Sequence, residues 1–225
     1  MIFIDPKLWA VASGTPIGNV DVGDIVQLRE NLVPVDYIVV HQGLPGSMYD
    51  ASCDGTWLLR KDIAENRAWD AGKSNVLETS DIQAYLNEDW MNRYDSDVVQ
   101  AVKQVKIPYC VGGGSAAVNS GANGLSCKTF LLSGYEVGFR QSDNRYFPQD
   151  GAKLAYFEAG IGSSANSKRV ATINENAGNW WLRSPYIVGA ATAWSVFPYG
   201  DPGNLSVTNS SGVRPALVLS SDFRI

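Results

Sequence analysis

The sequence has few of the side chains that enzymes most often use for nucleophilic or metal chemistry. Its 225 residues include one histidine, His41, and three cysteines, Cys53, Cys110 and Cys127. A catalytic triad would have to use His41, yet no serine stands in a Gly-x-Ser-x-Gly motif. The cysteines show no metal-ligand spacing and cannot all pair, which favours small buried thiols in a reducing compartment. The sequence therefore predicts no catalytic residue, no metal site and no cofactor.

The aspartates do not form a recognisable calcium loop either. Four of them fall on loop-rich sequence, at Asp50, Asp54, Asp62 and Asp70. None lies in an Asp-x-Asp-x-Asp-Gly pattern, and scattered acids of this kind usually form a solvated face. A structural calcium ion stays an open alternative without a motif to support it.

Positive charge and long apolar runs are scarce as well. The chain carries 18 Lys and Arg against 23 Asp and Glu, a net charge of -5 with a pI near 4.9. It has no basic stripe that could release counterions from nucleic-acid phosphates. No apolar run approaches the ~20 residues that span a bilayer, and residues 1–6 lack the regions of a signal peptide. We expect a protein made in the cytoplasm, with no nucleic acid partner and no membrane insertion.

Short β-branched runs between turn residues predict most of the secondary structure. The chain is 45% hydrophobic and 18% charged, and it is long enough to bury a substantial core as a single domain over residues 1–225. We expect strands at residues 24–28, 36–40, 56–60, 128–133, 180–183, 194–196 and 213–219. Few helices among many short strands indicate an α+β fold with long loops.

Two helices are expected in the middle of the chain. Ser80 with Gln83 forms a capping box, after which apolar residues recur at helical spacing at Ile82, Tyr85, Leu86 and Trp90. A second helix is predicted from Asp95, with one face formed by Val98, Val99, Val102 and Val105, and with its end at Pro108.

Two regions carry no clear periodicity. Residues 111–124 are almost entirely Gly, Ser, Ala and Asn, and no helix with a Lys-Ser/Thr pair follows them, so a flexible loop is favoured over a phosphate site. Residues 138–179 are irregular and polar, with several turn signals.

The last 50 positions contain no Lys, Glu, Gln or Met, although the first 175 contain 25 of these residues. Within this tail, Trp180-Trp181-Leu182-Arg183-Ser184-Pro185 and Gly212-Val213-Arg214-Pro215-Ala216-Leu217 enclose residues 186–211, which we call the bracketed segment. In a strand, Trp180 and Trp181 should face opposite sides. We interpret both as framework residues, with a stacking contact to a ligand as the alternative. Arg183 and Arg214 are interpreted as clamps on loop carbonyls or a carboxylate rather than as ligand contacts.

The two brackets and an ordered set of upstream blocks carry a family resemblance. The upstream blocks are Gly23-Asp24-Ile25-Val26, Met48-Tyr49-Asp50-Ala51-Ser52, Gly55-Thr56-Trp57-Leu58-Leu59, and Phe130-Leu131-Leu132-Ser133 with Glu136. Together they resemble the variable proteins of diversity-generating retroelements, in the branch of bacteria and their prophages that ends in a WWLRSP…GVRPAL tail. The resemblance implies a C-type lectin fold of the variant found in formylglycine-generating enzymes, with two helices packed on short, mostly antiparallel strands.

The resemblance also implies how the tail varies. In such systems an error-prone reverse transcriptase rewrites template adenines into a C-terminal variable region, here about residues 180–217. Asn AAC codons then yield residue types that exclude Lys, Glu, Gln, Met and Trp. The bracketed segment obeys this restriction except at Trp194, which we therefore expect to be a framework residue with Trp180, Trp181, Arg183 and Arg214.

The resemblance implies a non-enzymatic, hypervariable receptor or ligand binder, whose partner is an unnamed protein or surface ligand. Phe197 and Tyr199 are the expected anchors, since aromatic side chains dominate binding energetics. The expected ligand-facing positions are Ile187, Val188, Gly189, Ala191, Thr192, Ser195, Phe197, Pro198, Tyr199, Asp201, Pro202, Thr208, Asn209 and Ser210.

Two alternatives of other classes stay open. One is an enzyme related to formylglycine-generating enzymes, although no cysteine follows Cys127 to supply their late catalytic pair. The other is a structural component of a virion or a surface. Calcium-dependent sugar binding is not supported, because the tail lacks the Glu-Pro-Asn and Trp-Asn-Asp motifs. Association with a phage tail or with the cell, and an oligomer, are both compatible with the sequence.

Overall fold

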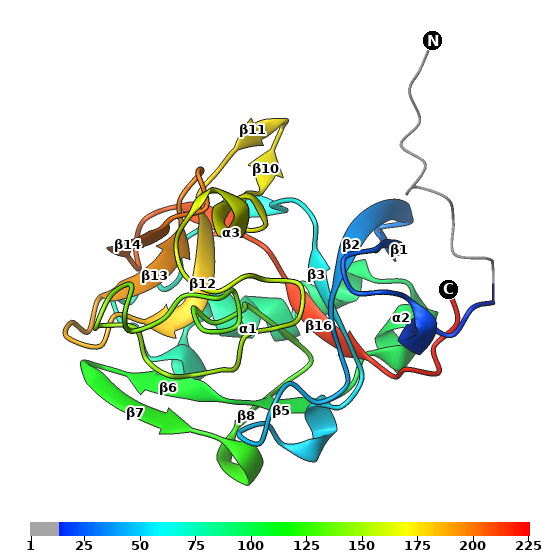
Figure 1. The fold of residues 1–225 in the computed structure, drawn as a ribbon, viewed down its shortest axis with the longest axis horizontal. Helices are drawn as coiled ribbons and strands as arrows, with labels where there is room; N and C mark the ends of the chain where they lie inside the picture. Colours follow the sequence, from blue (N-terminus) through cyan, green and yellow to red (C-terminus); the bar gives the residue numbers. More distant parts are fainter. Residues whose placement is uncertain (1–13) are drawn as a thin grey trace.

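Two five-stranded sheets form the frame of the protein in the computed structural model, which describes residues 14–225 (Figure 1). This mixed architecture, with many strands and short helices, confirms the α+β class. Residues 1–6, on which the signal-peptide argument rested, lie outside the described residues. The first sheet has the order β1 (Ile25–Glu30), β2 (Val33–Gln42), β3 (Thr56–Arg60), β16 (Ala216–Leu219) and β9 (Thr129–Phe130).

The second sheet contains most of the C-terminal tail. Its order is β14 (Pro202–Ser206), β13 (Thr192–Val196), β12 (Trp180–Pro185), β15 (Ser211–Val213) and β4 (Glu65–Arg67). In both sheets, the neighbouring strands within residues 14–225 pair antiparallel except β12 with β15, which are parallel. All seven predicted strand regions thus contribute to these two sheets, and β4 and β14 are strands that the sequence patterns did not predict.

Three two-stranded sheets and three short α-helices complete the described fold. The sheets pair β5 (Val105–Ile107) with β8 (Leu125–Cys127), β6 (Tyr109–Gly112) with β7 (Ser115–Asn119), and β10 (Thr172–Ile173) with β11 (Asn176–Ala177); the last two pairs are hairpins. The helices are α1 (Asp81–Asn87), α2 (Ser96–Ala101) and α3 (Ser163–Ser167). Single 3-10 turns occur at Ile17–Asn19, Ala51–Cys53, Leu77–Thr79, Met91–Arg93 and Gly121–Asn123.

The apolar core is divided into two clusters by strands that are buried on both faces. Along β3, Trp57 and Leu59 enter one cluster while Leu58 enters the other. Trp180 and Trp181 behave in the same way, since each is fully buried and they belong to different clusters. Adjacent residues of a strand point to opposite faces, so the prediction that the two tryptophans face opposite sides is confirmed.

The second bracket crosses from one sheet to the other. The sequence predicted one strand over residues 213–219, but β15 ends at Val213 in the second sheet and β16 begins at Ala216 in the first. Arg214 and Pro215 make the crossing, because proline lacks the amide donor that a continuous ladder needs. The predicted strand at residues 128–133 is likewise shorter, with only Thr129–Phe130 paired.

The first predicted helix is confirmed at its start. Ser80 precedes α1, and its Oγ accepts the Gln83 amide at 3.3 Å. The Ser80 amide instead donates to the Leu77 carbonyl, so the Gln83 side chain does not close a capping box. The second helix ends at Ala101, and Val105 starts β5, so the prediction of a helix up to Pro108 was wrong. Valine favours strands, and at residues 105–107 this preference outweighs the helical spacing of the valines.

The prediction of a flexible loop at residues 111–124 was also wrong. This stretch forms the end of β6, a tight turn, β7 and a 3-10 turn. Gly112 has φ 75°, and a Cβ added there would lie 2.2 Å from the Asn75 carbonyl oxygen. Gly112 is therefore required by its close packing on Asn75, and Gly113 and Gly114 have the positive φ angles of a tight turn, 65° and 84°, so these glycines are not a sign of mobility. Residues 138–179, predicted as irregular, contain α3 and the β10–β11 hairpin.

Candidate functional site

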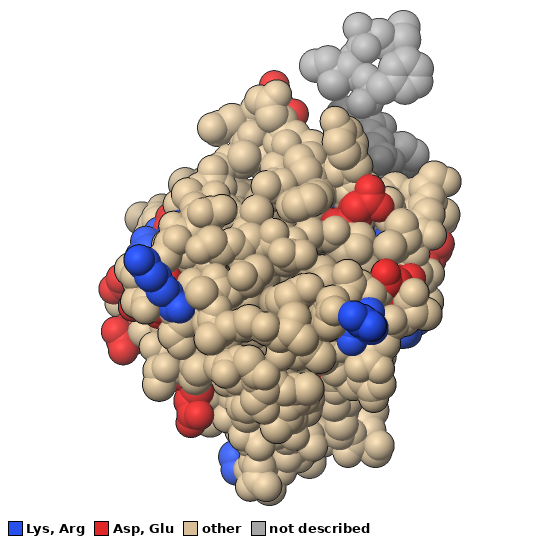
Figure 2. Space-filling view, turned by 90° about the vertical axis from the view of Figure 1, so that its left-hand side faces the viewer, with Lys and Arg blue, Asp and Glu red and all other residues tan. Residues whose placement is uncertain are grey.

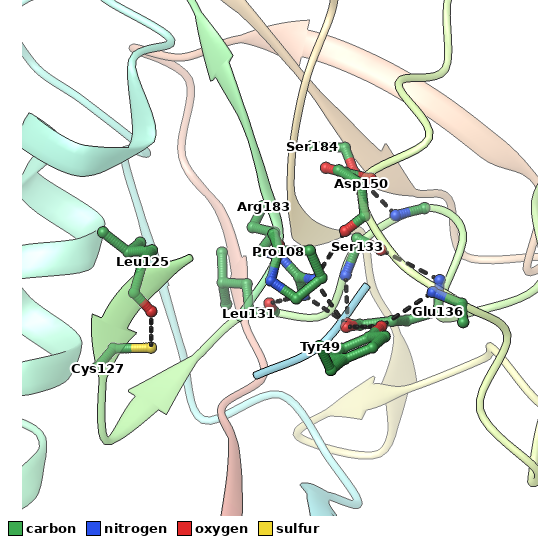
Figure 3. Close-up of polar contacts among 12 residues, drawn as sticks. Tyr49, Pro108, Leu125, Cys127, Leu131, Ser133, Glu136, Asp150, Arg183 and Ser184 are labelled. Atoms are coloured by element: carbon green, nitrogen blue, oxygen red, sulfur yellow. Dashed lines mark hydrogen bonds and ion pairs between the residues drawn. The ribbon is translucent and has the colours of Figure 1, made fainter. Parts of the chain in front are cut away.

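A buried ion pair fixes the start of the C-terminal tail (Figure 3). Arg183, in β12, is 1% exposed, and its guanidinium contacts both carboxylate oxygens of Glu136 at 2.5 and 2.7 Å. It also donates to the carbonyls of Pro108, Leu131 and Asp150 at 3.0 to 3.1 Å. Burial alone would lower the pKa of Arg183, but the Glu136 charge raises it above its ordinary value. Arg183 is thus a charged clamp on three separate loops.

The loop that carries Glu136 is fixed by further hydrogen bonds. The Tyr49 hydroxyl donates to Glu136 at 2.8 Å and accepts the Ala152 amide at 2.9 Å. Burial and the Glu136 charge together raise the pKa of Tyr49 well above its ordinary range. The Ser133 amide donates to the other oxygen of Glu136 at 2.9 Å. No oxygen of this fully buried carboxylate is accessible to a substrate, so the cluster is a structural element.

Asp150 is a second carboxylate in the same cluster. It is fully buried, and the Ser184 hydroxyl donates to its two oxygens at 2.8 and 3.0 Å. Burial raises the pKa of Asp150 to about 6, even though the Arg183 charge opposes this shift. Asp150 is therefore an acid whose charged form is unfavourable inside the fold.

Arg214 holds the second bracket in a similar way. Its guanidinium donates to the Arg60 and Lys61 carbonyls at 2.8 and 2.9 Å, and it lies 4.9 Å from the ring centroid of Trp180. Burial lowers its pKa to about 10. Both bracket arginines contact the scaffold through carbonyls or a carboxylate and are shielded from solvent.

One buried amide holds the beginning of the bracketed segment by its main chain. The Asn75 side chain, which is fully buried, donates to the carbonyls of Tyr186, Gly189 and Thr192 at 3.3, 2.6 and 2.8 Å. Its carbonyl oxygen accepts the Gly113 amide at 2.7 Å. Asn75 therefore joins the loop at residues 186–192 to the turn of the β6–β7 hairpin. The sequence patterns did not identify Asn75 as a functional residue, because the carbonyls that it contacts lie more than 100 residues away in the chain.

The turn between β13 and β14 is also held by its main chain. Arg169 donates to the Gly200 carbonyl at 2.8 Å, and the turn is closed by the Gly200 amide on the Phe197 carbonyl at 2.8 Å. Gly200 has φ 81°, and a Cβ there would lie 2.1 Å from the Asn166 carbonyl oxygen. Asn166 adds one side-chain contact, to Asp201 at 2.7 Å. A third support lies after β14, where the Val207 carbonyl accepts the amides of residues 69 and 70 at 2.8 and 3.0 Å.

Trp194 belongs to the framework although it lies within the bracketed segment. Its ring stacks on Phe147 with centroids 3.8 Å apart, and the ring of Tyr186 lies 5.3 Å away. The stack continues from Phe147 to Phe139 and from Tyr186 to Tyr146. Trp194 is 1% exposed, so its side chain forms part of the core.

The predicted ligand-facing positions divide into three groups by exposure. Six are exposed: Val188, Ala191, Tyr199, Thr208, Asn209 and Ser210. Seven are partly exposed: Ile187, Gly189, Thr192, Phe197, Pro198, Asp201 and Pro202. The remaining position, Ser195, is fully buried, because it lies on the same face of β13 as the buried Ala193 and opposite the buried Trp181. Ser195 therefore cannot face a ligand, whereas Ala190, Asn204 and Ser206 are exposed and were not predicted.

These positions do not form one compact patch. Residues 187–191 and 208–210 lie at one end of the β13–β14 hairpin, and the turn with Tyr199 lies at the other end. A five-residue strand such as β13 is about 17 Å long, which sets the separation of the two ends. Tyr199 and Val188, one at each end, are 80% and 60% exposed. Phe197 is less free, since its ring packs on Gly203, where an added Cβ would lie 2.1 Å from the ring.

The side of the molecule that carries this hairpin is poor in charge. Figure 1 shows β13, β14 and the β6–β7 hairpin on the same side, and Figure 2 shows that few charged side chains appear on that face. The bracketed segment itself contains one charged residue, Asp201. Depletion of charge is typical of the centre of a protein interface rather than of an ordinary solvated surface.

A small pocket lies where the bracketed segment meets the β6–β7 hairpin. It has a volume of about 390 Å³ and is lined by Met48, Ala116, Val118, Ser120, Gln141, Pro148, Gln149 and Ile187. None of these residues is charged. A larger groove of about 920 Å³ follows α1 and α2, but no residue of the bracketed segment lines it. We regard the small pocket as the functional candidate because it adjoins the exposed tail.

The residues that could support catalysis are occupied in packing. His41 accepts the Ala155 amide at 3.2 Å, and burial lowers its pKa. Cys53, Cys110 and Cys127 are buried and unpaired, as expected, and burial raises their pKa values to about 11, 11 and 12. Thiols with raised pKa are poor nucleophiles. Within residues 14–225, no cluster of His, Cys, Asp and Glu is arranged to hold a metal ion, and no helix is long and apolar enough to cross a membrane.

The chain belongs to a family defined as a domain of unknown function, DUF6273, whose model matches residues 54–221. The match includes the Arg183–Glu136 pair, Asn75 and the whole bracketed segment, but not β1 and β2. No curated protein and no solved structure matched the chain.

The buried acid predicts a specific pH dependence. The pKa of Asp150 is raised from an ordinary value of 3.8 to about 6, so the folded state binds more protons than the unfolded state between these values. The free energy of unfolding should therefore fall as pH rises from about 4 to 6, by an amount on the order of 2–3 kcal/mol attributable to this group. Urea denaturation at each pH should show that the unfolding free energy of the wild type, minus that of Asp150→Asn, decreases as pH rises. Asp222→Asn, at an exposed position, is the control. An increase of this wild-type-minus-variant value with pH would contradict the assignment.

Loss of the Asn75 amide should loosen two surface loops together. In Asn75→Ala the carbonyls of Gly189 and Thr192 lose a donor, which should cost about 2–4 kcal/mol of unfolding free energy. The Gly113 amide loses its acceptor and should exchange its hydrogen faster, as measured by hydrogen–deuterium exchange. Asn176→Ala removes an exposed amide that donates to the Asn174 carbonyl, and it should change stability by less than about 0.5 kcal/mol. Unchanged exchange at Gly113 would disprove the clamp.

Proposed function

We propose that this protein is a non-enzymatic binding protein whose bracketed segment presents a variable surface to a protein or surface ligand. The observation that carries the proposal is that the scaffold holds this segment mainly through its main chain. Asn75, Arg169 and the amides of residues 69 and 70 all contact carbonyls of the segment. Support of this kind does not depend on which side chains the segment carries.

The side chains that remain free fit a recognition role. The exposed positions carry Val, Ala, Tyr, Asn, Ser and Thr, an alphabet similar to that of antibody loops, where aromatic residues supply area and small polar residues adapt. Because the loops are ordered before binding, binding of a ligand would not include the free-energy cost of ordering them. An interface of standard size, about 800 Å² per partner, is wide enough to cover both ends of the β13–β14 hairpin.

The proposed fold is a C-type lectin fold, in the variant related to formylglycine-generating enzymes. The mostly antiparallel sheets, the short helices α1 and α2 and the long loops between the elements support this proposal. The related enzyme activity has no observation in its favour, because the three thiols are buried with raised pKa values. The protein would bind rather than convert its ligand, with Trp180, Trp181, Arg183, Trp194 and Arg214 as the framework.

The source of variation is proposed to be adenine-directed mutagenic retrohoming. It predicts a second, near-identical DNA repeat of the region that encodes residues 180–217, next to a reverse-transcriptase gene. Differences between the two repeats should fall at template adenines and should change codons of the bracketed segment, but not the Trp194 codon. Sequencing of the neighbouring DNA tests this directly, and a locus with neither repeat nor reverse transcriptase would refute the diversification.

The binding role is tested by randomising the exposed positions. We expect that a display library with Val188, Ala191, Tyr199 and Asn209 randomised stays folded, because these side chains contribute less than about 0.5 kcal/mol each to stability. Selection on an arbitrary protein, such as hen egg-white lysozyme, should then yield specific binders. Trp194→Ala is the control for a framework position and should cost about 3–5 kcal/mol. A library that folds but never yields binders would argue against a recognition surface.

A further inference from the structure

A cluster of charged and aromatic side chains joins β4 to α1 and to the 3-10 turn at Met91–Arg93. The Arg93 guanidinium donates to a carboxylate oxygen of Glu65 at 2.8 Å and to the Tyr85 hydroxyl at 2.7 Å. The same hydroxyl donates to the other oxygen of Glu65 at 2.8 Å. Burial opposes the ionisation of Glu65, but its hydrogen bonds from Arg93 and Tyr85 lower its pKa. These three groups therefore satisfy one another as an ion pair with a shared hydroxyl.

Arg67 is a second cation in this cluster and has no carboxylate of its own. Its Nη1 lies 3.3 Å from the Glu65 oxygen that already accepts the Tyr85 hydroxyl, and within residues 14–225 its guanidinium makes no other hydrogen bond. Glu65 is thus shared by Arg67 and Arg93, which leaves one positive charge in excess. The other exposed ion pairs of the described chain each join one cation to one acid: Arg29 with Asp95, Lys61 with Asp36, and Lys168 with Glu158.

The guanidinium of Arg67 is oriented before any ligand binds. Its central carbon lies 3.7 Å from the ring centroid of Tyr85, as expected for a guanidinium that stacks on an aromatic face. The Tyr85 ring is buried, and its hydroxyl is fixed by Glu65 and Arg93. The Arg67 side chain is nevertheless 42% exposed, so part of this oriented group is accessible to a ligand. Binding at Arg67 would therefore cost less conformational entropy than binding at a free surface arginine.

Arg67 also lies beside the surface proposed to bind ligands. In the register of β4 with β15 it is the partner of Ser211, the last residue of the bracketed segment, and the exposed residues 208–210 come directly before Ser211. The amides of residues 69 and 70 donate to the Val207 carbonyl, which fixes this end of the segment against the chain that follows Arg67. A ligand that covers residues 208–210 would therefore reach Arg67 as well.

We propose that Arg67 binds a carboxylate of the protein ligand at the edge of the surface formed by the bracketed segment. This inference rests on the proposed function and names a chemical feature of its ligand. The planar guanidinium offers paired N–H donors whose geometry matches a carboxylate. Because Arg67 lies in β4, outside residues 180–217, it would provide the same contact in every copy while the neighbouring positions vary.

The charge distribution of the whole molecule agrees with a local site of this kind. The net charge is -5, so the protein as a whole repels acidic segments, and an acidic ligand needs a local excess of positive charge. The face that carries the β13–β14 hairpin shows few charged side chains (Figure 2). Protein interfaces commonly combine a charge-poor centre with a polar rim, and Arg67 occupies a rim position relative to that face.

The test measures binding of a fluorescently labelled hexaglutamate peptide to the full-length protein by fluorescence anisotropy at low ionic strength. A hexaglutamine peptide of the same length is the neutral probe and should not bind. Arg67→Gln should weaken hexaglutamate binding about fivefold, the effect of losing one partly exposed charge pair. Glu65→Gln should strengthen it by a similar factor, because it removes the carboxylate that competes for Arg67. Opposite effects of these two variants are not expected if the cluster is only structural.

The ion pair of Lys168 and Glu158 supplies matched controls. Both side chains are exposed, and Asn166, which precedes Lys168 in the chain, contacts Asp201 at the other end of the β13–β14 hairpin. Lys168→Gln and Glu158→Gln change the net charge by the same amounts as Arg67→Gln and Glu65→Gln, and they should leave hexaglutamate binding unchanged. Circular dichroism of all four variants shows that they remain folded.

The outcomes separate this inference from the proposed function. Hexaglutamate binding that depends on Arg67, together with a randomised library that never yields binders, would support the carboxylate site and count against the bracketed segment. A library that yields binders, together with no hexaglutamate binding or with binding insensitive to Arg67→Gln, would overturn the carboxylate site and leave the proposed function intact. Equal losses in Arg67→Gln and Lys168→Gln would show a general effect of net charge and would also overturn the site.

Discussion

The burial of the Arg183 charge is the constraint on which most of the C-terminal half depends. Burying a guanidinium away from water costs least when its donors are satisfied and its charge is paired. Glu136 supplies the charge, and three carbonyls from separate parts of the chain supply the remaining acceptors. These requirements bring residues 108, 131, 136 and 150 to β12, and they fix the loops on which the Trp194 stack rests. Replacing either partner alone would leave an uncompensated charge in the core and would strongly destabilise the fold.

This constraint allows a separation between the parts of the tail that pack and the parts that face solvent. Residues whose side chains pack, such as Trp180, Trp181 and Trp194, are fully or almost fully buried. The loops between them are held by their carbonyls instead, through Asn75 and Arg169. Core packing restricts the identity of a residue through its volume and shape, whereas a carbonyl contact does not. The chain therefore restricts sequence where side chains interlock and leaves it free where only the main chain is fixed.

The sequence could predict those features that depend on local patterns. The strand at Thr56–Arg60, the N-terminal cap of α1 by Ser80 and the opposite orientations of Trp180 and Trp181 each follow from periodicity or from a short motif. It could not predict Asn75 as a clamp, because its three acceptors lie more than 100 residues away in the chain. It also mistook the glycines at residues 112–114 for a sign of mobility, since the turn that they form and the tight contact of Gly112 with Asn75 exist only in the folded chain. Ser195 was assigned to the surface for a related reason, because the packing of its face of β13 in the core beside Trp181 exists only in the folded sheet.

The geometry of the tail also limits which ligands the proposed binding surface could contact. Its exposed positions lie at two ends of a short hairpin rather than in one pocket, so a small molecule could touch only one end at a time. A ligand that uses both ends must extend over about 17 Å, the length of a strand like β13, and must do so across a face with few charges. Macromolecules with a flat or extended uncharged surface meet both conditions. Length and lack of charge thus both favour a protein over a small polar solute as the partner of the proposed binding surface.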